Sequence, residues 1–129
     1  MEDTLIERIR AAHETGAPLI LQGGGSKGFY GNADEGEVLS TRGLTGIVDY
    51  QPKELVLTAR AGTPLADIEA LLAEHGQMLA FEPPHYGEFP LAGRGAEGST
   101  RTIRATLGGA IAAGLSGPRR PYAGAARDF

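Results

Sequence analysis

The run Gly23-Gly24-Gly25-Ser26-Lys27-Gly28 is the first segment of this 129-residue chain whose residue types could do chemistry. Consecutive glycines can turn several backbone N–H groups toward one point, which creates a nest for an anion. Ser26 would add a hydroxyl donor, and Lys27 would add a positive charge. A tight exposed turn is the alternative interpretation, and this segment alone does not decide between the two.

Two specific phosphate-binding motifs match this run only in part. It has the spacing G-x-G-x-x-G, but a dinucleotide-binding loop must open into a helix, and segment 29–36 is a poor helix former. A Walker loop requires Ser or Thr after its lysine, whereas Gly28 follows Lys27 here. Both motifs are therefore excluded, and the general anion nest remains.

A second glycine loop, Thr106-Leu107-Gly108-Gly109, opens a stretch of small residues that predicts a short helix over 106–114. The first amides and the dipole of such a helix favour an anion. Glycines that only allow close helix packing are the alternative. Taken together, the two loops predict a pyrophosphate held from opposite sides.

Composition excludes several other kinds of site. The chain has 12 basic and 16 acidic residues and a net charge of −4, whereas nucleic-acid-binding domains are usually basic. It has no cysteine for a disulfide, an iron–sulfur cluster or a thiol nucleophile, and its three histidines lack zinc-site spacing. The longest uncharged run, 105–118, is too short and too glycine-rich to span a membrane, and the acidic N-terminus is unlike a secretory signal. A soluble cytoplasmic protein is therefore expected.

Hydrophobic periodicity predicts the helices that must hold these loops. One helix is expected over 3–15. A second is expected over 63–76, with Thr63 as its N-cap, Pro64 at its first helical position and Gly76 as its stop.

Between and after these helices, short apolar runs predict strands at 18–22, 37–41, 46–50, 54–62 and 78–81. The first is expected to be buried and the fourth half-exposed. Residues 82–101 predict a long loop, and 117–124 is turn-rich. Residues 126–129 look like the start of another strand, where complete chains seldom stop, so the chain is expected to be part of a larger protein. This order indicates an α+β fold rather than regular βαβ alternation.

The order of these motifs resembles that of the vanillyl-alcohol-oxidase/PCMH-type FAD-binding family. The segments that carry the resemblance are 19–27, 55–65, 106–112 and 117–122. The tail from Arg119 to Gly124, running into Arg127-Asp128-Phe129, is most similar to the branch of that family found as FAD-binding subunits of glycolate-oxidising complexes.

The resemblance implies a PCMH-type α+β fold. Its first subdomain, a small mixed sheet flanked by helices, would cover about 1–81. A loop, the glycine-rich helix and the start of the second subdomain would cover 82–129. The cofactor would be FAD, with contacts at Gly23, Gly24, Gly25, Ser26, Lys27, Pro84, His85, Thr106, Gly108, Gly109, Gly114, Ser116 and Gly117. The two glycine loops would hold the diphosphate or the ribityl chain, and the other residues would pass along the isoalloxazine ring.

Covalent attachment of the cofactor is not expected. Relatives that attach FAD covalently often carry a histidine in the first loop, where this chain has Ser26, and no cysteine is present for a second link. Arg119 and Arg120 suit a phosphate or a carboxylate, as guanidinium groups generally do, or they are simply exposed arginines of a turn.

The resemblance implies a subunit of an FAD-dependent oxidoreductase that oxidises a small 2-hydroxy acid, glycolate to glyoxylate. Its expected partners are a second flavin subunit and an iron–sulfur subunit, through which it would lie peripheral to the inner membrane. No residue stands out as a catalytic base, and residues 1–129 alone are expected to be inactive and to bind FAD weakly. A non-catalytic nucleotide- or anion-binding module is the alternative function, and a half-domain without ligand affinity is a third.

Overall fold

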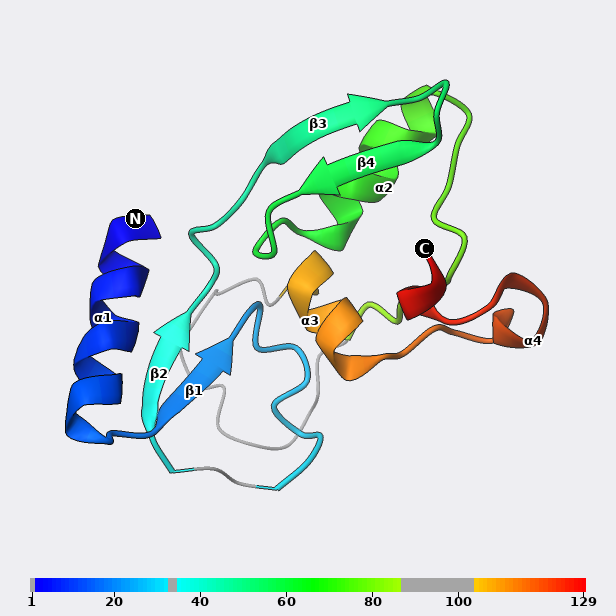
Figure 1. The fold of residues 1–129 in the computed structure, drawn as a ribbon. Coiled ribbons are helices and arrows are strands. Elements are labelled where there is room, and N and C mark those ends of the chain that lie inside the picture. The colour runs from blue at the N-terminus through cyan, green and yellow to red at the C-terminus, as the bar shows by residue number, and fades with distance from the viewer. Residues whose placement is uncertain (1, 33–34, 87–103) are drawn as a thin grey trace, which may run out of the picture.

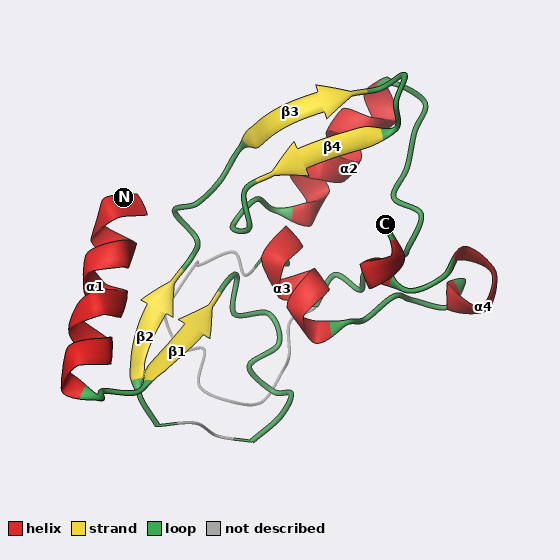
Figure 2. Cartoon of the chain, in the orientation of Figure 1, coloured by secondary structure: helices red, strands yellow, loops and turns green. Residues whose placement is uncertain are grey.

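The computed structural model describes residues 2–32, 35–86 and 104–129. Its elements, in chain order, are α1 (Glu2–Thr15), β1 (Leu19–Gln22), β2 (Glu37–Ser40), β3 (Ile47–Gln51), β4 (Val56–Ala59), α2 (Leu65–Glu74), α3 (Leu107–Ala113), α4 (Arg120–Ala123) and the 3₁₀ turn η1 (Ala126–Asp128). Figures 1 and 2 show two separate strand pairs with helices beside them. The expected α+β fold is confirmed. No helix in the described ranges is long and apolar enough to cross a membrane.

The first strand pair is parallel, with Leu19 opposite Glu37 and Gln22 opposite Ser40. Since parallel strands run in one direction, the segments that continue from β1 and β2 leave from the same edge of the pair. The expectation of a buried first strand is wrong, because Leu21 is 72% exposed and Ile20 only half-buried. A short apolar run does not reveal how many neighbours will cover it, and β1 has one paired strand among the described residues.

The second pair is the antiparallel hairpin β3–β4, which lies beside α2 in Figure 1. Alternate residues of β4 are half-buried, as expected for this strand. Tyr50 of β3 donates a hydrogen bond to Gln77, just beyond α2, at 2.6 Å, and this bond ties the hairpin to the end of the helix.

The starts of α2 and α3 are joined by a short antiparallel bridge between Pro64 and Thr106. The amide of Leu65 donates to the Ala105 carbonyl at 2.9 Å, and the amide of Leu107 donates to the Thr63 carbonyl at 2.9 Å. Leu65, Ala105 and Ala110 form a buried apolar cluster at this junction. The junction therefore holds the second glycine loop in place.

The ends of α2 depart in part from the expectation. Pro64 rather than Thr63 is the N-cap, because the buried Thr63 hydroxyl is engaged with Gly46, whose amide donates to it at 3.0 Å. Gly76 ends the helix as expected, with φ of +66° and its amide donating to the Ala73 carbonyl at 3.0 Å.

Two expected strands are wrong. Among the described residues, neither 78–81 nor 126–129 pairs with another strand, and the latter begins as the 3₁₀ turn η1. A strand needs a partner for its ladder, whereas Phe81 and Ala126 are buried as single side chains in irregular backbone. Of the expected loop 82–101, residues 82–86 are irregular and the rest lies outside the described residues.

Candidate functional site

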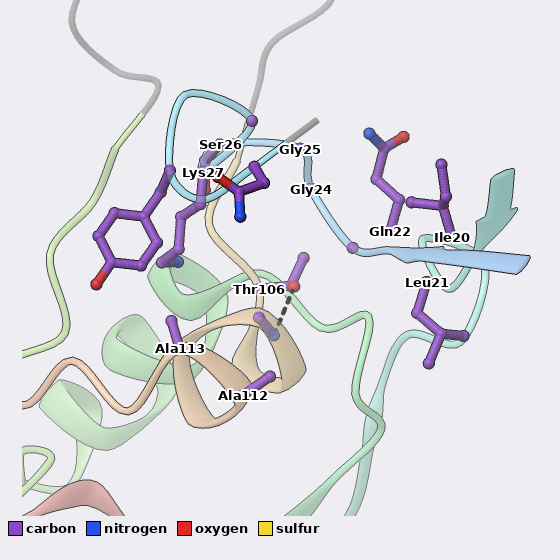
Figure 3. A pocket seen from close by; sticks show the side chains of 15 residues that line it. Ile20, Leu21, Gln22, Gly24, Gly25, Ser26, Lys27, Thr106, Ala112 and Ala113 are labelled. Carbon is purple, nitrogen blue, oxygen red and sulfur yellow. Dashed lines mark hydrogen bonds between the residues drawn. The ribbon is translucent and has the colours of Figure 1, made fainter. Parts of the chain in front are cut away.

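The first glycine loop and α3 face each other across a cleft of about 460 Å³ (Figure 3). The residues that line it are Ile20, Leu21, Gln22, Gly23, Gly24, Gly25, Ser26, Lys27, Gly28, Tyr30, Asn32, Thr106, Gly109, Ala112 and Ala113. Among these described residues there is no carboxylate, and Lys27 is the one cation. The lining is thus suited to an anion.

The loop owes its position to the parallel strand pair. It begins at Gly23, directly after β1, and the amide of Thr41, directly after β2, donates to the Gln22 carbonyl at 2.9 Å. Ligand sites in parallel sheets form at this edge, beyond the carboxyl ends of the strands. The next residue, Arg42, extends its guanidinium to the loop: Nε donates to the Gly23 carbonyl at 3.2 Å and an Nη donates to the Gly24 carbonyl.

The backbone amides of the first loop have no acceptor among the described residues. In the described ranges, none of the amides from Gly23 to Lys27 donates a hydrogen bond to another residue. Gly25 has φ of +78°, a left-handed conformation that favours glycine and turns the chain sharply. Buried or half-buried donors without protein acceptors need another partner, which an anion would supply.

The amides at the start of α3 are all used inside the protein. They donate to the carbonyls of residues before α2 or to the N-cap: Leu107 to Thr63 at 2.9 Å, Gly108 to Ala61 at 2.8 Å, Gly109 to the Thr106 hydroxyl at 3.3 Å and Ala110 to the Thr106 carbonyl at 2.9 Å. Figure 3 marks the bond between Thr106 and Gly109. Thr106 is the N-cap of the short helix that was predicted here, and α3 offers the cleft a wall rather than free donors.

Several glycines have a packing role as well. A Cβ at Gly24 would overlap the Arg104 carbonyl oxygen, and one at Gly23 would lie 2.6 Å from the Thr106 hydroxyl oxygen. At Gly108 a Cβ would lie 2.9 Å from the Ala61 Cβ. The two glycine-rich segments therefore approach more closely than any side chain would permit.

Ser26 and Lys27 stand at the turn of the first loop. Ser26 is buried and Lys27 is half-buried, and this burial lowers the pKa of Lys27 below its ordinary value of 10.5 because it disfavours the charged form. The Lys27 ammonium lies 6.0 Å from the centre of the Tyr86 ring, which in turn meets Phe29 edge to face at 5.2 Å. These contacts connect the loop with segment 82–86.

The structure places six of the predicted contact residues outside the lining of this cleft. Gly108 packs on Ala61, Gly114 ends α3, and the Ser116 hydroxyl accepts from the Ala126 amide at 3.0 Å. A Cβ at Gly117 would clash with Glu82. Pro84 lies in segment 82–86 and, like the other five, stays a prediction.

The sixth of these residues, His85, lines a second cleft, also of about 460 Å³, between α2 and segment 77–85. Its Nε2 lies 3.0 Å from a Glu69 carboxylate oxygen. Glu82, in the same cleft, pairs with Arg119 at 2.8 Å, so this arginine binds a carboxylate of its own chain. With two carboxylates in its wall, the second cleft is not suited to a diphosphate.

Eight residues of the cleft lining were not among the predicted contacts: Ile20, Leu21, Gln22, Gly28, Tyr30, Asn32, Ala112 and Ala113. Arg42, which was not predicted either, holds the loop from outside the lining. Arg42 lies just beyond β2, so knowledge of the pairing between β1 and β2 would have pointed to it. The sequence does not state that pairing.

Comparisons with known proteins agree on one family. A family model described as an FAD binding domain matches residues 1–101. Over 125 residues, the chain is 48% identical to the glycolate oxidase subunit GlcE of Escherichia coli strain K12, and this region makes up 97% of the chain and 31% of that relative. The chain thus spans less than a third of that relative's length. No solved structure matches it.

Proposed function

The chain belongs to the FAD-binding-domain family, and from this we propose that the cleft between the first loop and α3 binds the diphosphate of FAD. The observation that carries the proposal is that residues Gly23 to Lys27 line an acid-free cleft while their amides have no acceptor among the described residues. Bound FAD supplies the two-electron chemistry, while the protein supplies binding and orientation.

Each part of the cleft would have a separate task. The loop amides would donate to the phosphate oxygens, the Ser26 hydroxyl would add a donor, and Lys27 would balance charge. Thr106 and Gly109 would form the opposite wall. The proposed ring-side contacts remain Pro84, His85, Gly114, Ser116 and Gly117. Gly108 remains a proposed contact of the diphosphate or the ribityl chain, and the proposed subdomain division stays near residue 81.

Non-covalent attachment is part of the proposal. The chain has no cysteine, and no histidine is among the described residues that line the cleft. His85, which lines the second cleft, is engaged with Glu69. A cofactor held by amides and one lysine would therefore be released when the protein unfolds.

The wider activity we propose is oxidation of a small 2-hydroxy acid, glycolate to glyoxylate, by a complex in which this chain is an FAD-binding subunit. Identity of 48% to a protein named as a glycolate oxidase subunit supports it. The proposed partners are a second flavin subunit and an iron–sulfur subunit, in the cytoplasm and attached to the inner membrane only through partners.

The test begins with the native protein that contains this chain. A flavin absorption band that passes a filter after denaturation would support non-covalent FAD, and bleaching of the band by glycolate would support the substrate. A colourless protein that takes up neither FAD nor ADP would overturn the proposal. Uptake of ADP or pyrophosphate with no preference for FAD would instead favour the anion-binding module.

A further inference from the structure

Arg42 contacts the first loop on its carbonyl side. Its guanidinium donates through Nε to Gly23 at 3.2 Å and through an Nη to Gly24, so that two successive carbonyls converge on one side chain. Arg42 is half-buried and is absent from the lining of the cleft. Any effect on a ligand in the cleft therefore passes through the loop.

The geometry of the peptide unit links this contact to the amides. In a planar trans peptide the C=O and the following N–H point in opposite directions. When the carbonyls of Gly23 and Gly24 turn toward Arg42, the amides of Gly24 and Gly25 must turn away from it. Glycine can rotate freely, so without such a clamp the three consecutive glycines would sample many orientations.

The charge of Arg42 is not neutralised by a carboxylate in the described part of the chain. Arg8, Arg60, Arg104 and Arg119 each pair with a carboxylate, at distances from 2.5 to 3.5 Å. The Arg42 guanidinium, by contrast, bonds only to backbone carbonyls and to no acidic side chain among the described residues. A cation on the carbonyl end of a peptide polarises it and makes its N–H a stronger donor.

We propose that Arg42 is a positioning residue, which fixes the peptides of Gly23 and Gly24 so that the amides behind them are presented to the diphosphate. This inference rests on the proposed function, since the diphosphate is that of FAD. It adds a residue that touches neither the cleft nor the ligand. The two-pronged guanidinium, rather than positive charge alone, does the positioning.

The experiment compares Arg42→Met, Arg42→Lys and the control Arg10→Met in the native protein, stripped of flavin. Arg10 is exposed on α1, so its replacement removes the same charge at a distance from the loop. Affinity for FAD and for ADP is measured by titration. The orientation of the loop is followed by the hydrogen exchange and NMR shifts of the Gly24 and Gly25 amides without ligand, and unfolding midpoints are recorded.

Arg42→Met is expected to weaken both ligands about tenfold, the loss of roughly one charge-assisted hydrogen bond's contribution. The two amides should shift, and Arg10→Met should match wild type. Arg42→Lys should recover only part of the affinity. If Arg42→Met does not fold, the affinity of Arg42→Lys compared with wild type tests the proposal. Full recovery of affinity in Arg42→Lys, or unchanged affinity in a folded Arg42→Met, would overturn the positioning role of Arg42 but leave the proposed FAD site standing. A wild-type protein that binds neither ligand would overturn the proposed function with it.

Discussion

The two glycine-rich segments of this chain look alike in sequence and differ in how their backbone is used. In the first, the amides from Gly23 to Lys27 have no acceptor among the described residues, while Arg42 holds two of the carbonyls. In the second, every amide from Leu107 to Ala110 donates to another part of the protein. A glycine-rich segment therefore indicates where two parts of the backbone come close together. Whether it is a binding loop or a packed one depends on whether its N–H groups already donate to acceptors within the protein.

The same contrast extends to the contribution of the side chains. The first loop carries Lys27, whose pKa is lowered by burial, and so brings an incompletely solvated cation to the cleft. The second segment contributes alanine and glycine faces and the capping hydroxyl of Thr106. We therefore regard the first loop as the part that attracts the anion and α3 as the part that limits the space. Substitutions on either side of the cleft can test that division.

The largest effect is expected from Gly24→Ala. The new Cβ would overlap the Arg104 carbonyl, with or without ligand, so the loop and segment 104–109 would have to separate. We expect the free energy of unfolding to fall by about 3 kcal/mol or more, as for other overpacked or strained sites. Chemical unfolding without ligand measures this. A bulky residue at Gly24 thus tests packing before it tests cofactor binding.

Gly28→Ala is the matched control for that variant. Among the described residues, a Cβ at Gly28 would meet only the Gly25 carbonyl oxygen, at the ordinary distance of 3.6 Å. Its unfolding free energy should stay within about 0.5 kcal/mol of wild type. Equal losses of unfolding free energy in the two variants would show that the close approach of Gly24 to Arg104 does not govern stability. Gly24 and Gly28 would then not differ in their packing role.

Lys27→Met should have the next largest effect, and it should act on affinity rather than on folding. Methionine fills similar volume, while removal of a half-buried charge facing a phosphate should weaken FAD and ADP binding about tenfold. Titration of the flavin-free protein measures this. The unfolding midpoint without ligand should not fall, because desolvation makes the charged lysine unfavourable in the fold. Unchanged affinity would remove Lys27 from the anion site.

Thr106→Val should show the reverse pattern. It removes the hydroxyl that caps α3 by accepting from the Gly109 amide, and lost N-caps cost about 1 kcal/mol of stability. Affinity for ADP in the folded protein should change less than about twofold, and Thr106→Ser should restore stability. A large loss of affinity with normal stability would show that α3 binds the anion directly.

The parts of the fold that depend on local signals were predictable. Periodicity predicts α1 and α2, Gly76 marks a helix end, and the run of small residues after Thr106 predicts α3. The expected strands at 78–81 and 126–129 failed, because a strand depends on a partner elsewhere in the chain.

Prediction of the site had the same limit. The glycines and Lys27 could be found in the first loop from their own residue types. The parallel pairing of β1 with β2, which brings Arg42 to the loop, is non-local, and so are the acceptors Ala61 and Thr63 that take up the α3 amides. A sequence shows which donors a loop has, whereas the fold decides which of them remain free.

The smallest effect should be a pH dependence of ADP affinity that belongs to Lys27. A bound diphosphate favours the ammonium and raises the pKa that burial had lowered, so the complex takes up a proton where the free protein has lost one. Affinity should therefore be constant at neutral pH and fall, by about threefold or less, as the pH rises through the lowered pKa toward 10.5. ADP suits this titration because its phosphates are already fully ionised there. Lys27→Met should abolish this pH dependence and Thr106→Val should keep it, since only the first loop carries the titrating group. If the ADP affinity of Lys27→Met still fell with rising pH, the dependence would belong to another residue. The distinction between an anion-attracting first loop and a space-limiting α3 would then be weakened.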